Sequence, residues 1–321
     1  MSFAIELAEL GFFPDQIIRY GVHGLVKERL EESNELASGN HATVLERFVD
    51  SLRDAPIAEV PNLANDQHYE VPANFFGHVL GKHRKYSSCY YENPQDSLDQ
   101  AEAAMLRLTC ERAQIEDGMR ILELGCGWGS LSLWLAEQYP NANILSVSNS
   151  TSQKAWIDAQ AEDRGLGNLQ VQTCDMNNFE PEGEYDRVIS VEMFEHMKNW
   201  ELLISKLDRV MSSEAKLFLH VFSHRIHAYH FVKENDDEWM ARHFFSGGMM
   251  PSHQIFDRLQ VPLQLDSSWF VNGTHYQRTS DHWLENLNRQ KSEIMPILES
   301  TYGYREARRW FHRWRIFFIA C

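Results

Sequence analysis

A glycine-rich turn between an apolar run and a helical pattern constrains the fold of this chain more than any other feature. Residues 119–124 (MRILEL) are typical of a short buried strand, and residues 130–139 (SLSLWLAEQY) return to apolar residues at helical spacing. Gly125, Gly127 and Gly129 stand between them. Because glycine has no Cβ, a ligand can lie directly against the backbone of such a turn. The sequence therefore predicts a strand, a ligand-binding turn and a helix.

Strand and helix patterns alternate around this turn. Strands that alternate with helices indicate right-handed crossovers and a parallel, doubly wound sheet. A chain of 321 residues, with 43% hydrophobic and 24% charged side chains, is long enough for one large domain or two moderate ones. We expect an α/β fold preceded by amphipathic helices in the first 55 residues. The predicted strands are 143–147, 169–173, 186–191 and 215–221, and the predicted helices are 97–113, 151–163 and 202–211.

The position of one acid indicates which ligand the turn fits. Glu123 lies two residues before the first glycine, and the third glycine follows the second after one intervening residue. A carboxylate at Glu123 can pair with the methionine ammonium group of S-adenosylmethionine, whereas it would repel the pyrophosphate of a dinucleotide. We therefore favour S-adenosylmethionine as the cofactor. A dinucleotide and a purely structural turn are the two alternatives.

Two further strand ends supply candidate cofactor contacts. After the second strand, where an acid that binds ribose hydroxyls is expected, the chain has Ser148, Asn149 and Gln153, so hydroxyl and amide groups must take that role. After the third strand, Asp175 is placed to accept a hydrogen bond from the adenine amino group, with Met176 beside the ring. The alternative for Asp175 is a helix N-cap.

Composition argues against several classes of partner. The 46 acidic and 30 basic side chains give a net charge of −16, which repels nucleic acids and anionic membrane surfaces. The five cysteines are widely spaced and form no CxxC motif, as is typical of free thiols in a reducing compartment. No apolar run is long enough for a membrane span, and Glu6 and Glu9 lie where a signal peptide would carry basic residues. We expect a cytoplasmic protein without stable membrane insertion.

Specific motifs are spread along the chain from about residue 67 onward, namely KYSSCYY, LDQAEAAML, LELGCGWGS, VSNSTSQK, YDRVISVEMFEHMKN, HFFSGGMMPS and VNGTHYQRT. With these motifs the chain resembles the cyclopropane fatty acid synthase superfamily of methyltransferases, and within it the plant coclaurine N-methyltransferases. The resemblance implies a Rossmann-like methyltransferase domain at 67–321, a helical lid inserted around 224–275 and an N-terminal helical extension at 1–66. It also implies cofactor contacts at Gly125, Gly127, Ser148, Asn149, Gln153, Asp175 and Met176.

Catalytic residues are expected after the fourth strand, because the carboxyl ends of strands line the ligand crevice of a doubly wound sheet. Glu192, Glu195 and His196 match acidic and imidazole residues implicated in catalysis by the N-methyltransferases. Amines are mostly protonated at neutral pH, so Glu195 and His196 would hold the ammonium group and then take its proton. Glu192 would add a second negative charge if a helix began at Phe194. The alternative is a polar helix start, with Glu195 at its N-terminus.

The resemblance to the cyclopropane synthases implies a different base. In those enzymes a bound bicarbonate ion acts as the base, at positions that correspond to Ser88, Glu195, His220 and Tyr276. They have a cysteine where this chain has Ser88, and Cys89 follows one residue later. This departure argues against a bicarbonate site and favours an amine as the methyl acceptor.

Histidines and aromatic residues are frequent after the last predicted strand. His220, His224, His227 and His230 recur at the spacing of zinc ligands on a helix, but no HExxH motif is present and we expect no metal. The aromatic residues of this region belong either to the core or to a wall that would suit an amine or an acyl chain. They are Phe244, Phe245, Trp269, Phe270, Tyr276 and Trp283.

Three functions fit these features to different degrees. The first is N-methylation of a small aromatic or benzylic amine, the second is cyclopropane synthesis on unsaturated acyl chains of phospholipids, and the third is dinucleotide-dependent oxidation. A phospholipid substrate would favour a basic docking face, which the acidic net charge does not supply beyond the short basic run at 82–85. We therefore favour the amine over the lipid. The N-terminal helical segment also offers a surface for a homodimer.

Overall fold

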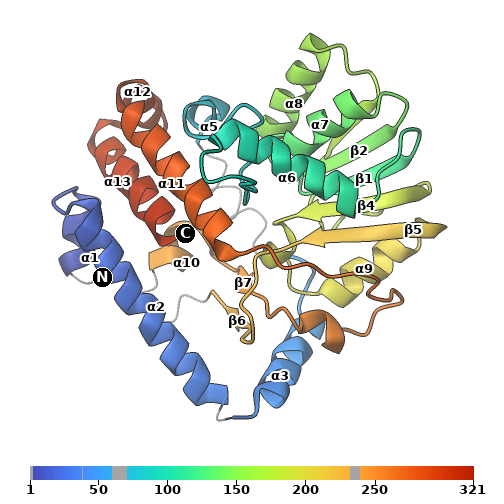
Figure 1. The fold of residues 1–321 in the computed structure, drawn as a ribbon, viewed down its shortest axis with the longest axis horizontal. Coiled ribbons are helices and arrows are strands. Elements are labelled where there is room, and N and C mark those ends of the chain that lie inside the picture. Colours follow the sequence, from blue (N-terminus) through green and yellow to red (C-terminus); the bar gives the residue numbers. More distant parts are fainter. Residues whose placement is uncertain (1–2, 38, 60–70, 232–238) are drawn as a thin grey trace.

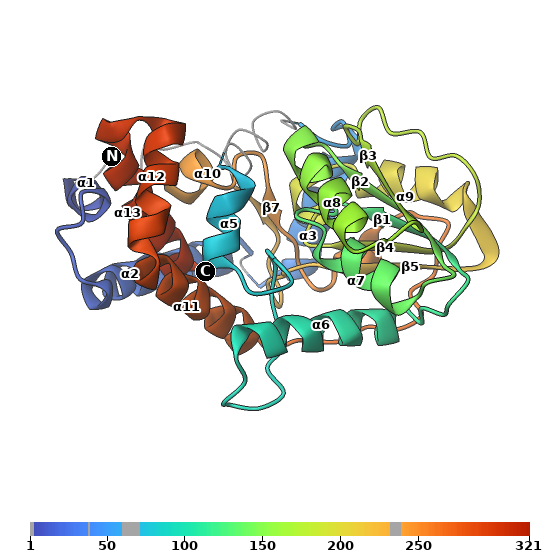
Figure 2. The same cartoon turned by 90° about the horizontal axis from the view of Figure 1, so that it is seen from above.

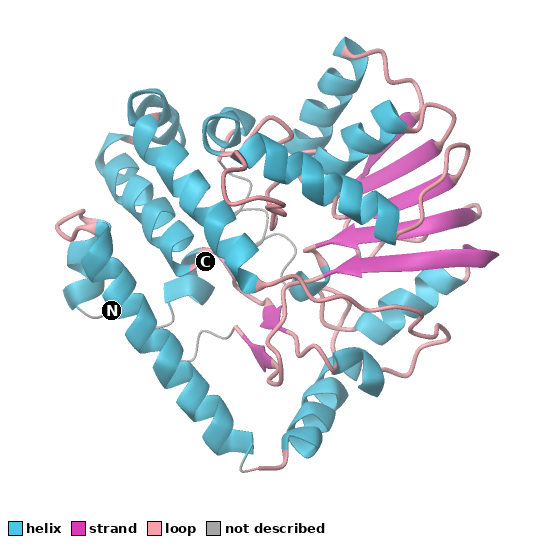
Figure 3. Ribbon diagram, viewed as in Figure 1, coloured by secondary structure: helices cyan, strands magenta, loops and turns pink. Residues whose placement is uncertain are grey.

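The computed structural model describes residues 3–37, 39–59, 71–231 and 239–321. It contains a parallel sheet of five strands in the order β3-β2-β1-β4-β5, drawn on the right of Figures 1 and 3. The strand order reverses between the neighbouring strands β1 and β4. A doubly wound sheet forms its ligand crevice at this point. The predicted α/β class is confirmed. The strands are β1 (Arg120–Leu124), β2 (Asn143–Ser148), β3 (Leu169–Thr173), β4 (Tyr185–Val191) and β5 (Met211–His220).

The observed elements lie within a few residues of the predicted ones. Both α8 (Thr151–Asp163) and β3 begin and end where the sequence predicts. The largest difference is at β5, which starts at Met211 instead of Ala215. Met211 pairs with Tyr185 of β4. Backbone pairing therefore extends the strand through the polar residues 212–214, which carry no apolar signal.

Helices cover both faces of the sheet. Ile121 and Ile189 pack with α6 and α7, whereas Leu122 and Val188 pack with α3 and α9 on the opposite face. Successive residues of a strand point to opposite faces, so a strand covered on both sides is apolar throughout. These helices are α3 (His41–Arg53), α6 (Leu98–Arg112), α7 (Ser130–Gln138) and α9 (Trp200–Asp208).

A helical lobe lies opposite the carboxyl ends of the strands (Figures 1 and 2). Phe76, Trp283 and Trp314 are buried in its core. Trp128 of the glycine turn belongs to the same cluster, with its ring centroid 5.1 Å from that of Phe76. The turn is therefore held between the sheet and this lobe. The lobe is built from α1 (Phe3–Glu9), α2 (Asp15–Ala37), α5 (Ala73–Val79), α11 (Gly273–Arg289), α12 (Lys291–Tyr302) and α13 (Tyr304–Ala320).

The N-terminal helices α1, α2 and α3 confirm the predicted helical segment, whereas the lid region differs from the expectation. Within 224–275 the described residues form two short helices, α10 (Trp239–His243) and η2 (Ile255–Arg258), and a hairpin of β6 (Tyr229–His230) and β7 (Met249–Met250). The Gly247-Gly248 pair and Pro251 interrupt any longer helix here. The long helices begin only at Gly273. The predicted domain boundary at 66/67 lies outside the described residues.

Candidate active site at the carboxyl ends of the strands

The glycine turn adopts a backbone conformation that L side chains rarely take. Gly125, Gly127 and Gly129 have φ angles of +77°, +53° and +79°. A Cβ at Gly125 would lie 2.5 Å from Cγ of Met193, and one at Gly129 would lie 2.6 Å from Cγ1 of Ile157. A Cβ at Gly127 would meet nothing within 4 Å. Two glycines are thus required by packing, and the third faces open space that a ligand can fill.

Glu123 is buried directly before this turn, with 4% of its surface exposed. Its Oε2 accepts hydrogen bonds from the hydroxyls of Ser132 (2.5 Å) and Ser146 (2.7 Å). Burial raises the pKa of Glu123, and the two hydroxyls act in the opposite direction. The residue lines a cavity beside the turn. Its contact with a cofactor ammonium group stays a prediction.

A buried donor of α8, beside the end of β2, has no hydrogen-bond partner among the described residues. Ser148 donates to Oε1 of Gln153 (2.6 Å) and accepts from the N–H of Ser150 (3.0 Å). Gln153 is 1% exposed, and its Nε2 has no hydrogen-bond partner among the described residues. A buried donor without an acceptor is costly, and Gln153 lines the cavity beside the glycine turn. This arrangement fits a cofactor that accepts the missing hydrogen bond.

The predicted adenine contacts, Asp175 and Met176, follow β3, the strand next to β2 in the sheet. Ser148 pairs with Thr173 of β3, so the residues after both strands are neighbours. Oδ1 of Asp175 accepts from the N–H of Asn177 (2.8 Å) within a turn, and no helix begins there. Asn177 also exchanges hydrogen bonds of 3.0 and 2.8 Å with the backbone of Ala58. Met176 is buried, and Asn149 is half-buried beside Ser148.

Residues that were not among the predicted site residues complete the wall of the cavity. Lys85, Tyr86, Ser87 and Thr109 line it together with the glycine turn and Glu192. The first three belong to the stretch 75–91, which is rich in aromatic and basic residues. That composition is the signal by which they could have been found.

Glu192 forms hydrogen bonds with three segments that are distant from one another in the sequence. It follows β4, and its N–H donates to the carbonyl of His220 at the end of β5 (2.7 Å). Its Oε1 accepts from the N–H of Ser88 (2.8 Å), and its Oε2 accepts from the hydroxyl of Tyr276 on α11 (3.0 Å). Nε2 of His220 lies 3.9 Å from Oε1. The φ angle of Glu192 is +49°, which is a strained conformation for a residue other than glycine. The contacts of its side chain and backbone hold this conformation in place.

The surroundings of Glu192 act on its pKa in opposite directions. Burial has the largest effect and raises the pKa above its usual value, whereas the ammonium of Lys85, the N–H of Ser88 and the hydroxyl of Tyr276 act to lower it. Burial lowers the pKa of His220 to about 3, so its imidazole is neutral near pH 7. The carboxylate is therefore surrounded by donors and one cation.

Glu195 and His196 make separate contacts on the next turn, η1 (Phe194–His196), which begins at Phe194 as expected. Glu195 is fully buried, and its Oε1 accepts from the N–H of Phe222 (2.6 Å). Burial and the charge of Glu192 raise the pKa of Glu195 well above its usual range. The His196 ring stacks on Phe245 at 5.0 Å, and burial lowers the pKa of His196 to about 4. Glu195 also lies in the first turn of η1, where the alternative of a polar helix start would place it.

The four histidines of the zinc alternative do not converge. His220 lies beside Glu192, and His230 contacts Nζ of Lys198 at 2.8 Å. The rings of His224 and His227 lie 4.8 Å apart. Across the described residues we find no cluster of histidine, cysteine or acidic side chains arranged to hold a metal ion.

The aromatic residues divide between the core and the site. Phe244 and Trp283 are buried in the helical lobe, whereas Trp269 and Phe270 are largely exposed. Phe245 stacks on His196, the residue after Glu195. The centroid of its ring lies 5.7 Å from that of Phe222 and 5.4 Å from that of Phe231. The hydroxyl of Tyr276 contacts Glu192. Of the six predicted aromatic residues, Phe245 and Tyr276 therefore lie near the candidate catalytic residues.

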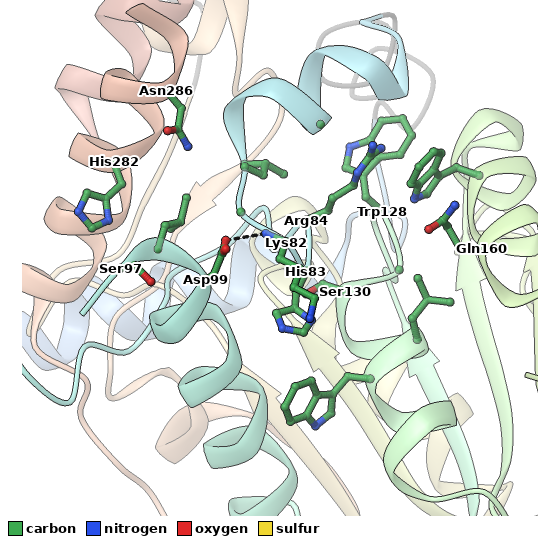
Figure 4. A pocket seen from close by; sticks show the side chains of 18 of the residues that line it. Lys82, His83, Arg84, Ser97, Asp99, Trp128, Ser130, Gln160, His282 and Asn286 are labelled. Atoms are coloured by element: carbon green, nitrogen blue, oxygen red, sulfur yellow. Dashed lines mark hydrogen bonds between the residues drawn. The ribbon is translucent and has the colours of Figure 1, made fainter. Parts of the chain in front are cut away.

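A larger cavity of about 620 Å³ lies outside this constellation. Figure 4 shows its lining, with His282 and Asn286 of α11 on one side, Trp128 and Gln160 on the other, and Lys82, His83 and Arg84 between them. Arg84, Trp128 and Ser130 line both this cavity and the smaller one of about 80 Å³ at the glycine turn. None of the predicted site residues lines it. We therefore assign the candidate site to the smaller cavity.

No helix in the part of the chain that the structure describes has the length and apolar character needed to cross a membrane.

Comparisons with known proteins agree with this architecture. The chain matches the family of mycolic acid cyclopropane synthetases over residues 59–315. It is 36% identical to (S)-coclaurine N-methyltransferase of Thalictrum flavum subsp. glaucum, over 98% of this chain and 89% of that protein. It is 33% identical to pavine N-methyltransferase of the same plant, over 98% and 90% of the two chains.

A solved structure of coclaurine N-methyltransferase, bound to N-methylheliamine and SAH, superposes with a TM-score of 0.95. The two proteins are 34% identical, and the match covers 99% of this chain and 92% of the other. The predicted Rossmann-like fold and the predicted use of S-adenosylmethionine are confirmed by these matches. The protein is thus an S-adenosylmethionine-dependent methyltransferase and belongs to the mycolic acid cyclopropane synthetase family.

Proposed function

We propose that the protein transfers a methyl group to the nitrogen of a small aromatic or benzylic amine. One observation carries the proposal: the carboxylate of Glu192 lies among Ser88, His220 and Tyr276, three of the four positions expected for bicarbonate in the cyclopropane synthases. A fixed carboxylate repels a bicarbonate ion and attracts an ammonium group. The similarity to coclaurine N-methyltransferase supports the same acceptor class.

The described residues fit S-adenosylmethionine. The open space at Gly127 admits the methionine part, with Gly125 and Glu123 beside it. Nε2 of Gln153 has no hydrogen-bond acceptor among the described residues, and we assign the ribose of the cofactor as its acceptor. Bound there, the cofactor supplies an electrophilic methyl group. The remaining contacts are assigned to Ser148 and Asn149 for the ribose and to Asp175 and Met176 for the adenine.

Glu192 is our candidate for holding and deprotonating the amine. Burial raises the pKa of its carboxyl, Lys85, Ser88 and Tyr276 favour the ionised form, and the side chain lines the cavity at the glycine turn. Taking the proton frees the nitrogen lone pair, which is the nucleophile. Glu195 holds its own proton, because burial and the neighbouring charge disfavour a second anion. Glu195 and the neutral imidazole of His196 therefore have supporting roles in this proposal.

Transfer of a labelled methyl group to competing acceptors tests the proposal. The acceptors are tetrahydroisoquinolines and phenethylamines on one side and vesicles of unsaturated phospholipid on the other. We expect label in the amines. Label in the lipid acyl chains alone would show the alternative function, that of a cyclopropane-fatty-acyl-phospholipid synthase.

We also infer a cytoplasmic homodimer. All five cysteines are free thiols, as in a reducing compartment. Leu25, Val26 and Leu30 are exposed on α2, which lies at the edge of the molecule in Figure 1. Light scattering on the purified protein should give the mass of a dimer, and Leu25→Glu should give that of a monomer. A monomeric wild-type protein would contradict the inference.

A further inference from the structure

The ammonium group of Lys85 is buried beside the candidate site, and the proposed reaction does not use it directly. Lys85 is 3% exposed. Its Nζ donates to the hydroxyl of Ser87 (2.5 Å) and to the carbonyl of Ser88 (2.8 Å). A buried lysine loses its hydration, so these contacts must offset a large cost. Indeed, burial lowers the pKa of Lys85.

These contacts lie on both sides of the Ser87-Ser88 peptide, whose N–H holds Glu192. The N–H of Ser88 donates to Oε1 of Glu192 (2.8 Å), and the carbonyl of the same residue accepts from Lys85. The next residue, Cys89, donates its N–H to the hydroxyl of Thr279 on α11 (3.1 Å). Residues 87–89 are thus tied to a lysine on one side and to the helical lobe on the other. A shift of this peptide would move the hydrogen bond on Glu192.

The backbone of Lys85 is itself anchored by Glu102, a buried acid of α6 within the motif LDQAEAAML. Oε1 of Glu102 accepts from the N–H of Gly81 (3.0 Å) and of Lys85 (3.1 Å), and Oε2 accepts from the N–H of His83 (2.7 Å). One carboxylate therefore holds three amides of the segment 81–85. The helix α6 in turn begins with a capping box formed by Ser97 and Gln100.

The charge of Lys85 also acts on Glu192. It lowers the pKa of the Glu192 carboxyl, as do the donors Ser88 and Tyr276. Glu195 and Cys321 also interact electrostatically with this carboxyl, and His220 lies 3.9 Å away as a neutral imidazole.

We propose that Lys85 is a positioning residue for methyl transfer, which fixes the Ser87-Ser88 peptide against Glu192 and supplies the cation that faces its carboxylate. The proposal rests on the proposed function of Glu192. Lys85 need not touch the cofactor or the amine for this role, since it acts through the Ser88 peptide and through its charge.

The test compares Lys85→Met, which keeps the length and removes the charge, with Lys85→Arg and the control Lys82→Met. Lys82 is an exposed residue of the same basic run. With tetrahydroisoquinoline as acceptor, we expect kcat of Lys85→Met to fall about 10²-fold. We also expect the acidic limb of its kcat/KM profile to move up by about one pH unit, because a lost cation raises the pKa of the Glu192 carboxyl. Lys85→Arg should recover part of both effects, and Lys82→Met should show neither.

An unchanged acidic limb in a folded Lys85→Met enzyme would overturn the proposal, even if its kcat fell. A crystal structure of this variant gives a readout independent of turnover. We expect the distance from Ser88 N to Glu192 Oε1 to exceed hydrogen-bonding range, and an unchanged 2.8 Å contact would contradict the proposal. Wild-type enzyme that methylates no amine would instead refute the proposed function, and the crystal structure would still decide the role of Lys85.

Discussion

The hydroxyl of Tyr276 donates a hydrogen bond of 3.0 Å to Oε2 of Glu192, which lies 84 residues earlier in the chain. Tyr276 belongs to α11 of the helical lobe, and Glu192 follows a central strand of the sheet. The two parts of the molecule therefore meet on one carboxylate. The site exists only when the lobe is docked on the strand ends.

Tyr276→Phe tests this contact. The ring stays, but the donor to Glu192 is lost, so the pKa of the carboxyl should rise and the acidic limb of kcat/KM should move to higher pH. We expect kcat to fall about tenfold, with S-adenosylmethionine affinity unchanged. Rate profiles against pH and calorimetric titration with the cofactor measure these effects. A pH profile identical to that of the wild type would show that the contact does not act on the base.

Glu192→Gln and Glu195→Gln should differ in strength. Glutamine cannot accept the amine proton at position 192, and we expect turnover to fall about 10²- to 10³-fold. At position 195 burial and the charge of Glu192 favour the protonated side chain, so glutamine offers similar hydrogen-bonding groups and a loss of about tenfold is expected. Single-turnover rates with saturating cofactor compare the two variants. A larger loss at 195 than at 192 would make Glu195 the base.

Gly127→Val should abolish cofactor binding. The side chain would project into the open space at the turn, and we expect affinity to fall at least about 10²-fold. Gly118→Val is the matched control, because Gly118 also has a positive φ (+89°) and open space but lies before β1, away from the strand carboxyl ends. Equal affinities of the Gly127→Val and control variants would remove the turn from the cofactor site.

Glu102 should make stability depend on pH. Burial raises the pKa of this carboxyl to about 7 in the folded protein, against an ordinary value of 4.5. The folded state thus binds this proton more tightly than the unfolded state, so the contribution is complete below pH 4.5 and is lost as the pH rises through 7. Relative to Glu102→Gln, the wild type should lose about 2.5 kcal/mol of unfolding free energy between pH 5 and pH 8. Denaturant titrations at both values measure it. Parallel pH dependences would mean that Glu102 titrates normally.

The sequence was most informative where local pattern and tertiary structure agree. The sequence predicted β1 to β4 within one residue, most clearly at the central strand β1, where burial on both faces leaves a nearly continuous apolar run. The glycine turn was found because two of its glycines, Gly125 and Gly129, are required by packing and the third faces open space.

Contacts between distant segments were not predictable from the sequence. Lys85 lies 17 residues from Glu102 and 107 from Glu192, and no local pattern links the three. The raised pKa of Glu195 depends on complete burial, which the motif EMFEHM does not show. The helices α11 to α13 were not predicted either, although Trp283 and Leu287, or Phe311 and Trp314, recur at helical spacing.

The response to bicarbonate tests the central claim most directly, because Glu192 lies where the cyclopropane synthases are expected to hold that ion. The measurement is the rate of amine methylation by the wild type as bicarbonate is removed from the buffer and then restored. We predict the same rate at every concentration, since a protein carboxylate already serves as the base. A rate that falls when bicarbonate is removed and recovers on its addition would contradict the account.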